Sequence, residues 1–295
     1  MDKNSLEKER ENIKIKKIKV SIPPLKIQGI KSKLIPTIID SIILNKETVW
    51  IEPFMGSGVV GFNVMPKPAI FSDTNPYIIN FYNDIKSGKI TYQIVRKYLE
   101  IEGQKLSVGD DEYYYKVRQR FNETHDSLDF LFLNRACFNG MMRFNKDGNF
   151  NVPYCHKPQR FSKAYITKIV NQVKHVESLI KENDWQFVCQ SFEKTIEMTK
   201  DISDAFIYCD PPYIGRNTDY YDGWSEEKEV ALKNHLVQSK KKFMLSTWDY
   251  NKYRRNEYIS SVWGFCNKIN ISHFYHVGAK EDNREAMIEA LLTNY

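Results

Sequence analysis

The chain has 295 residues, a formal net charge of +6 and 42% hydrophobic residues. That length allows one large domain or a core domain with an insertion, and the apolar fraction excludes wholesale disorder. No apolar run approaches the roughly 18 residues of a membrane span, so we expect no membrane partner. No apolar segment follows Met1–Ser5, and the five cysteines show no metal-ligand spacing. We therefore expect no signal peptide, no zinc site and a reducing cytoplasm as the setting.

The positive charge is concentrated in residues 130–176. Eight basic residues stand there against a single acid, Asp147, so this segment carries +7 and the rest of the chain sums to −1. A basic segment on a near-neutral remainder favours an anionic partner that docks at one place, with nucleic acid as the leading candidate. A solvated basic surface explains the charge equally well at this point.

The first elements in chain order are a tail and a helix. Residues 1–20 are rich in lysine and glutamate, which predicts a flexible tail. A helix is expected to begin near Ser32, a good N-cap, with Pro36 tolerated in its first turn. The loop before it contains Gly29 and Lys31, and so offers a flexible approach and one long cation.

A nucleotide-binding pattern follows this helix. Thr48–Ile51 is a predicted strand, and Gly56 and Gly58 form a Gly-x-Gly turn before a further helix. Strand, glycine turn and helix open a nucleotide-binding βαβ unit, because glycines let a ligand approach the backbone closely. A second strand over 69–73 ends in Asp73, where an acid suits the two hydroxyls of a ribose. No phosphate-binding lysine motif is present, so the pattern indicates a ligand that contains adenosine without a polyphosphate.

The alternation of strands and helices is interrupted between about residues 87 and 165. Helices are predicted over 113–121 and 128–136. Asp147-Gly148 predicts the turn of a β-hairpin. Aromatic residues are interleaved with the basic ones here, and more than half of them are expected to pack the insertion itself.

The alternation then returns and implies an α/β protein. The expected elements are two helices, three strands and a terminal hairpin: helices over 165–180 and 226–238, strands over 186–189, 206–209 and 243–246, and a hairpin that pairs 268–275 with 288–293.

The strand before residue 210 ends at Asp210-Pro211-Pro212-Tyr213, because consecutive prolines donate no backbone hydrogen bonds. Asp210 and the Pro211 carbonyl are two acceptors for a planar amino group, and Tyr213 can stack on its ring. This arrangement fits the exocyclic amine of adenine. From these four residues alone, a strand-ending turn capped by aspartate fits about as well.

Three motifs, taken together, resemble those of the Dam-type DNA adenine-N6 methyltransferases. They occur in the order cofactor motif, recognition insertion and catalytic motif: Glu52-Pro53-Phe54-x-Gly56-x-Gly58, Leu133-Asn134-Arg135 with Asn139-Gly140, and Asp210-Pro211-Pro212-Tyr213. The resemblance covers residues 22–295. Lys26, Gly29 and Lys31 match the family's leading cofactor motif. Within the family, residues 130–153 and 290–295 most resemble the EcoRV modification methyltransferase.

The resemblance implies a Rossmann-like, S-adenosylmethionine-dependent methyltransferase sheet over 21–86 and 165–295. It also implies that 87–164 is a mainly helical DNA target-recognition domain that carries the β-hairpin. Three groups of site residues follow from matching positions. The catalytic residues are Asp210, Pro211, Pro212 and Tyr213; the cofactor-binding residues are Ile27, Lys31, Phe54, Gly56, Gly58, Asp73, Phe192 and Asp210; and the DNA-binding residues are Lys26, Arg135, Phe138, Asn139, Gly140, Met141 and Arg143.

Among the DNA-binding positions, Lys26 and Arg143 match guanine readers and Arg135 matches a residue near the phosphates. Phe138 stands where many members have tyrosine, and Ile27 where many have tryptophan. The implied recognition site is GATATC in first place and GATC in second.

The resemblance thus implies a monomeric bacterial or phage enzyme that methylates N6 of a flipped adenine in double-stranded DNA. It would be the modification half of a restriction-modification system, whose endonuclease shares the site without binding the chain directly. Two alternatives remain: a methyltransferase acting on cytosine N4 or a protein amide, and a non-catalytic DNA-binding module. Asp rather than Ser or Asn before Pro-Pro-Tyr opposes the first, and the intact motifs oppose the second.

Overall fold

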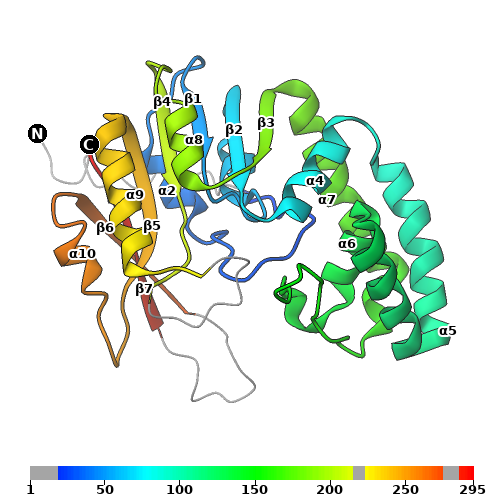
Figure 1. Cartoon of the computed structure of the whole chain (residues 1–295). Coiled ribbons are helices and arrows are strands. Elements are labelled where there is room, and N and C mark those ends of the chain that lie inside the picture. Colours follow the sequence, from blue (N-terminus) through cyan, green and yellow to red (C-terminus); the bar gives the residue numbers. More distant parts are fainter. Residues whose placement is uncertain (1–18, 215–222, 275–285) are drawn as a thin grey trace, which may run out of the picture.

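The computed structural model describes residues 19–214, 223–274 and 286–295. Their strands form one seven-stranded sheet in the order β3-β2-β1-β4-β5-β7-β6 (Figure 1). The strands from β1 to β5 pair in parallel, whereas β7 is antiparallel to both β5 and β6. The strand bounds are β1 Val49–Glu52, β2 Pro68–Asp73, β3 Asp184–Cys189, β4 Ala205–Cys209, β5 Lys242–Tyr250, β6 Asn267–Phe274 and β7 Ala286–Thr293.

The strand order reverses direction between β1 and β4. From β1 the chain adds β2 and β3 on one side, then returns to place β4 on the other side. In open parallel sheets, ligands bind outside the carboxyl ends of the strands at such a switch point. The Rossmann-like fold expected from the sequence is therefore confirmed, and its topology places the candidate site after β1 and β4.

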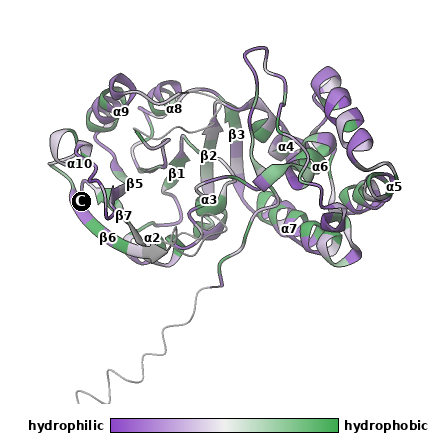
Figure 2. Ribbon diagram, turned by 90° about the horizontal axis from the view of Figure 1, so that it is seen from below, coloured by the Kyte–Doolittle hydropathy of each residue, from purple (hydrophilic) through white to green (hydrophobic). Residues whose placement is uncertain are grey.

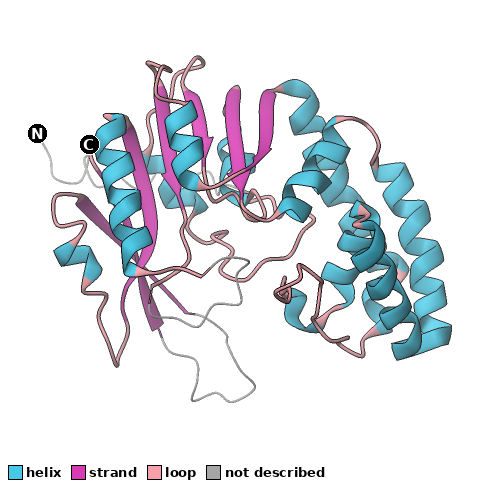
Figure 3. Cartoon of the chain, viewed as in Figure 1, coloured by secondary structure: helices cyan, strands magenta, loops and turns pink. Residues whose placement is uncertain are grey.

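Helices cover both faces of the sheet, and a helical lobe extends from its β3 edge (Figures 1 and 3). The helix bounds are α2 Ile35–Ser41, α3 Val59–Val64, α4 Pro76–Lys86, α5 Tyr92–Thr124, α6 Ser127–Ala136, α7 Lys163–Glu182, α8 Phe192–Met198, α9 Glu226–Ser239 and α10 Tyr258–Ser261, with 3-10 turns η1 at Phe138–Gly140 and η2 at Pro158–Phe161. None of the helices within the described ranges is long and apolar enough to cross a membrane.

Successive side chains of a strand point to opposite faces of the sheet, and so contribute to two hydrophobic cores. In β4, Phe206 and Tyr208 belong to the cluster shared with α2, α3 and α4, whereas Ile207 and Cys209 belong to the cluster shared with α8 and α9. This is the pattern of a strand buried on both faces. Figure 2 shows the two helical layers on opposite sides of the strands, and a largely hydrophilic α5 at the outer edge of the lobe.

Three local predictions differ from the structure in detail. Ser32 does not cap a helix, because α2 begins at Ile35 after a turn that ends at Leu34. The helix expected over 113–121 is part of the 33-residue α5. The turn at Asp147-Gly148 is present, but its ladder is a single bridge between Phe144 and Phe150.

Side chains limit the ladder at both of its ends. Asn145 Oδ1 accepts from the N–H groups of Asp147 and Asn149, and Arg143 Nη2 donates to the Asn151 carbonyl at 3.5 Å. A longer hairpin would pair the Asn149 N–H and the Asn151 carbonyl with the opposite backbone, so side chains take their place. The N–H and C=O of Phe150 face away from the opposite strand and bond to the side-chain amide of Asn122 on α5 at 2.8 and 3.3 Å.

Candidate active site

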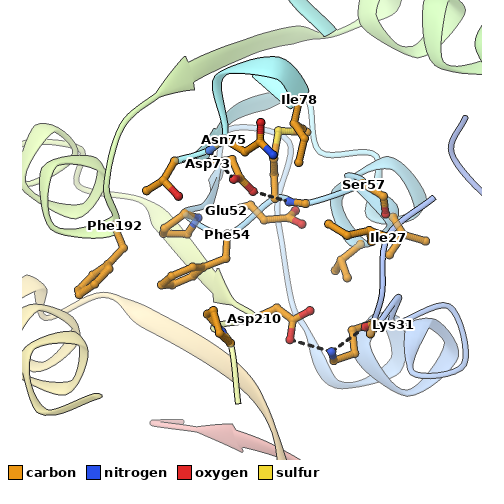
Figure 4. A pocket seen from close by; sticks show the side chains of 18 of the residues that line it. Ile27, Lys31, Glu52, Phe54, Ser57, Asp73, Asn75, Ile78, Phe192 and Asp210 are labelled. Carbon is orange, nitrogen blue, oxygen red and sulfur yellow. Dashed lines mark hydrogen bonds and ion pairs between the residues drawn. The ribbon is translucent and has the colours of Figure 1, made fainter. Parts of the chain in front are cut away.

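A cavity of about 200 Å³ lies at the switch point of the sheet (Figure 4). Its walls come from the carboxyl ends of β1, β2 and β4 and from the loop before α2. Many of the residues expected from the sequence line it: Ile27, Lys31, Phe54, Gly56, Asp73, Met141, Phe192, Asp210 and Pro212. The motifs expected to bind the cofactor and to catalyse, far apart in the chain, therefore meet at one cavity.

The glycine turn after β1 is held in place by Asp73. Gly56 and Gly58 have φ of +48° and +75°, backbone angles that favour glycine. Asp73 Oδ2 accepts from the Gly56 N–H at 2.9 Å, and Asp73 Oδ1 accepts from the Asn75 N–H at 2.9 Å. The carboxylate thus joins the loops that follow β1 and β2 while it lines the cavity.

Glu52, at the end of β1, is a cavity residue that was not among the expected site residues. It is 1% exposed, and its Oε2 accepts from Trp50 Nε1 at 2.8 Å and from the Gly61 N–H at 3.0 Å. Burial raises the pKa of the Glu52 carboxyl to about 8, against the lowering effect of the Trp50 hydrogen bond. The sequence could have indicated Glu52 as a site residue, because it is the acid that begins the motif expected to bind the cofactor.

Glu52 should make the free energy of unfolding fall as pH rises from about 4.5 to about 8. In that window the unfolded carboxyl has lost its proton and the folded one retains it, so ionisation favours the unfolded chain. Glu52→Gln should remove this component while its amide oxygen still accepts from Trp50. Urea titrations of both proteins at pH 5, 6, 7 and 8, without ligands, measure the difference. Parallel pH profiles would contradict the raised pKa.

Asp210 is bound on one of its two oxygens. Oδ1 lies 2.9 Å from Lys31 Nζ and accepts from Ser246 Oγ at 2.7 Å. Burial raises the pKa of Asp210, and the Lys31 ammonium and the Ser246 hydroxyl oppose that rise. Among the described residues no donor reaches Oδ2, so this oxygen can accept a hydrogen bond from a ligand in the cavity.

Tyr213 is fixed by the antiparallel strand. Its hydroxyl donates to Glu289 Oε1 at 2.6 Å, and its ring lies 4.9 Å from Lys31 Nζ. Glu289 lies on β7 and is 1% exposed, and Ser246 lies on β5 and is fully buried. Neither residue was expected at the site. Strands β5 and β7 therefore orient the Asp210–Tyr213 motif that follows β4.

Aromatic rings gather at the other end of the cavity. Phe54 and Phe192 stack with centroids 5.5 Å apart, and Trp224 lies 5.5 Å from Phe54 and 5.6 Å from Phe192. Glu229 accepts from the indole N–H groups of Trp224 and Trp263 at 2.6 and 2.7 Å. Trp224 and Glu229 were missed because the sequence surrounding them shows only the start of a helix. The three rings offer flat apolar surfaces for a planar ligand.

The expected DNA-binding residues lie beside this cavity, but not all at the surface: Arg135 and Gly140 are buried, and Met141 lines the cavity. The side chain of Asn134 bonds both backbone groups of Lys26, at 2.8 and 2.9 Å, and so ties the leading loop to α6. Gly140 allows this approach, because a Cβ there would lie 2.8 Å from Lys26 Cβ. Phe138 is half exposed and Asn139 is exposed with φ of +53°.

Comparisons with known proteins agree with this geometry. Residues 28–277 match the family model described as D12 class N6 adenine-specific DNA methyltransferase. The chain is similar to the type II methyltransferase M.FokI of Planomicrobium okeanokoites, with 30% identity over 92% of this chain and 42% of that protein. The modification methylase StsI of Streptococcus sanguinis is 27% identical over 99% of this chain and 46% of its own length. A DNA adenine methylase of Haemophilus influenzae is 34% identical over 65% and 63%. The chain thus spans less than half the length of the first two relatives.

Proposed function

Because the chain belongs to the D12 class of N6 adenine-specific DNA methyltransferases, we propose that it transfers a methyl group from S-adenosylmethionine to N6 of an adenine flipped out of double-stranded DNA. One observation carries the proposal. The open oxygen of Asp210 and the Asp73-braced glycine turn line the same cavity. This adjacency supports an acceptor for the target amine beside a site for the adenosine of the cofactor.

The residues present fit this cofactor. Phe54, Phe192 and Trp224 would hold its adenine ring, and Asp73 would bind the ribose hydroxyls. Glu52, buried and lining the cavity, would face its positively charged methionine end. When bound, S-adenosylmethionine supplies an electrophilic methyl group on a sulfonium sulfur.

Asp210 and Pro211 act on the target amine. Asp210 Oδ2 and the Pro211 carbonyl would each accept a hydrogen bond from N6, which turns the nitrogen lone pair toward the methyl group. Ser246 and Lys31 keep the carboxylate in position through Oδ1. Asp210 or water would take the N6 proton as N6 gains the methyl group, whose bond to sulfur breaks to leave neutral S-adenosylhomocysteine; no covalent enzyme intermediate is needed. Positioning of the reactants and preorganised polar groups would accelerate the methyl transfer.

The experiment is transfer of labelled methyl groups to duplex DNA, followed by mapping of the modified bases. N6-methyladenine at one short sequence supports the proposal. Methylation on cytosine N4 or on a protein would favour the alternative methyltransferase. DNA binding without any transfer would favour a non-catalytic module.

We also propose that residues 87–164 are the target-recognition domain beside the catalytic parts 21–86 and 165–295. The chain would act as a monomer in a bacterial or phage-infected cytoplasm, where the free cysteines of this protein remain reduced. A cognate endonuclease would share its site, for which GATATC is the first choice and GATC the second.

Arg143→Ala should weaken methylation of the preferred site by about 1–3 kcal/mol and relax discrimination at one G·C pair. Asn151 Oδ1 accepts from Arg143 Nε at 2.9 Å and its carbonyl accepts from Nη2 at 3.5 Å, which leaves Nη1 and the second N–H of Nη2 to approach guanine O6 and N7. The measurement is methylation of a panel of single-base site variants. An equal loss on every duplex would assign Arg143 to the DNA backbone instead.

A further inference from the structure

The hairpin over 142–152, which carries Arg143, depends on residues outside it for its position. Its strands pair at a single bridge, between Phe144 and Phe150, and an isolated two-stranded hairpin is at best marginally stable in water. On one side the side-chain amide of Asn122 on α5 bonds to both backbone groups of Phe150. The placement of the expected guanine reader therefore depends on how the neighbouring helices hold this hairpin.

Tyr77, in the first turn of α4, contacts the hairpin from another side. Its hydroxyl donates to the Gly148 carbonyl at 2.9 Å, and its ring stacks on Phe144 with centroids 4.9 Å apart. Tyr77 is 8% exposed, and rings from α5 and α6 pack against it, so its own position is well defined. One polar and one apolar contact thus fix the turn of the hairpin and the residue that precedes Arg143.

The first turn of α4 also belongs to the cavity at the switch point of the sheet. Asn75 and Ile78 line this cavity on the same side as Asp73 (Figure 4). Asp73 Oδ1 accepts from the Asn75 N–H at 2.9 Å, and Asn75 Oδ1 accepts from the Tyr77 N–H at 3.0 Å. Two hydrogen bonds therefore connect the expected ribose ligand to the residue that holds the hairpin.

The base of the hairpin reaches the same cavity. Met141 and Met142 line it together with Asn75 and Ile78 of the α4 side. A ligand that fills the cavity would contact both sides at once. Because a ligand favours the conformation with which it makes the better contacts, a bound cofactor would favour the arrangement in which the hairpin is docked on α4.

We propose that Tyr77 is a positioning residue that couples cofactor binding to sequence readout. It holds the hairpin against α4, so that S-adenosylmethionine raises the affinity for the preferred site more than the affinity for other DNA. The inference rests on the proposed function for the identity of both ligands. Tyr77 is not a lining residue of the cavity and acts through its neighbours. By thermodynamic linkage, the preferred duplex must raise the affinity for the cofactor by the same factor.

The first test is a binding cycle with S-adenosylhomocysteine, the preferred duplex and a duplex altered at the G·C pair assigned to Arg143. The measured quantity is the factor by which S-adenosylhomocysteine increases discrimination between the two duplexes. Tyr77→Phe keeps the ring and loses the hydrogen bond to Gly148, so this factor should fall about two- to tenfold, the range for one hydrogen bond. Tyr92→Phe is the matched control, because it lies at the end of α5 far from Asn122 and should leave the factor unchanged.

This factor separates coupling from a merely structural role. A residue that only stabilises the fold would change the melting temperature or both affinities and leave the factor as it is. A wild-type factor of one, or equal factors in the wild type and Tyr77→Phe, would overturn the proposal.

Hydrogen exchange without DNA separates failure of this inference from failure of the proposed function. S-adenosylhomocysteine should slow exchange of the amides of 144–150 in the wild type and in Tyr92→Phe, and much less in Tyr77→Phe. Such protection in a protein that methylates no DNA would support the coupling of cavity and hairpin and refute the proposed function. Equal protection in the wild type and Tyr77→Phe, with DNA methylation intact, would refute the coupling alone. Failure of S-adenosylhomocysteine to bind would refute both.

Discussion

Asp210→Asn is expected to lower the single-turnover rate of methyl transfer by a factor of about 10²–10³, with little change in DNA or cofactor affinity. The amide oxygen can still accept from Lys31 and Ser246, as Oδ1 does now. The amide NH₂ then occupies the place of Oδ2 and faces the target amine, so a donor opposes a donor. The orienting hydrogen bond is lost and the fold is kept.

The asparagine variant is more informative than alanine. Lys31 is 4% exposed, and Asp210→Ala would remove the oxygen to which Lys31 and Ser246 both donate, whereas asparagine keeps it. Removing one partner of such a pair typically destabilises a protein by about 3–5 kcal/mol, which would mix a folding defect with the chemistry. Asp201→Asn, an exposed carboxylate, is the matched control. Near-normal transfer by Asp210→Asn in rapid-quench measurements would sink the proposed role.

The sequence was sufficient for the sheet and for the residues at its strand ends. Apolar runs that stop at Glu52, Asp73 and Asp210 predict parallel strands, and parallel strands bring their carboxyl ends to one edge. The structure confirms this edge, because the three acids line one cavity. The order of the motifs along the chain then identified the family, and local sequence patterns placed their residues at the correct strand ends.

Contacts that depend on strand register could not be predicted from the sequence. Ser246 reaches Asp210 because β5 pairs with β4, and Glu289 reaches Tyr213 because β7 inserts between β5 and β6. Neither residue lies in a recognisable motif. Register results from packing over the whole sheet, so no local pattern could have named these two residues.

Which charged side chains are buried could not be predicted from the sequence either. The composition showed where the basic segment lies, but not that Arg135 is buried while Arg143 is only partly buried beside Asn151. Helical spacing shows which face is apolar; it does not show that the end of α6 is covered by η2 and α7. The distinction between a phosphate contact and a base contact depends on that cover.

Asp73→Ala is expected to weaken S-adenosylmethionine binding by about 3 kcal/mol, the upper end of the roughly 1–3 kcal/mol that one lost ribose pair costs. The structure gives the reason for the upper end. The substitution also frees the N–H groups of Gly56 and Asn75, so the glycine turn loses the bond that ties it to the end of β2. Calorimetry with cofactor alone measures the effect without depending on catalysis.

Asp73→Asn separates the two contributions. Its amide oxygen can accept from one of the two backbone N–H groups, while its NH₂ opposes the other, so we expect a loss intermediate between wild type and Asp73→Ala. Asp201→Ala serves as the carboxylate control away from the cavity. If Asp73→Ala binds the cofactor as the wild type does, the ribose site lies elsewhere. If Asp73→Asn is as weak as Asp73→Ala, both bonds are needed together, because the carboxylate holds the Gly56 turn only while the Asn75 N–H fixes its other oxygen.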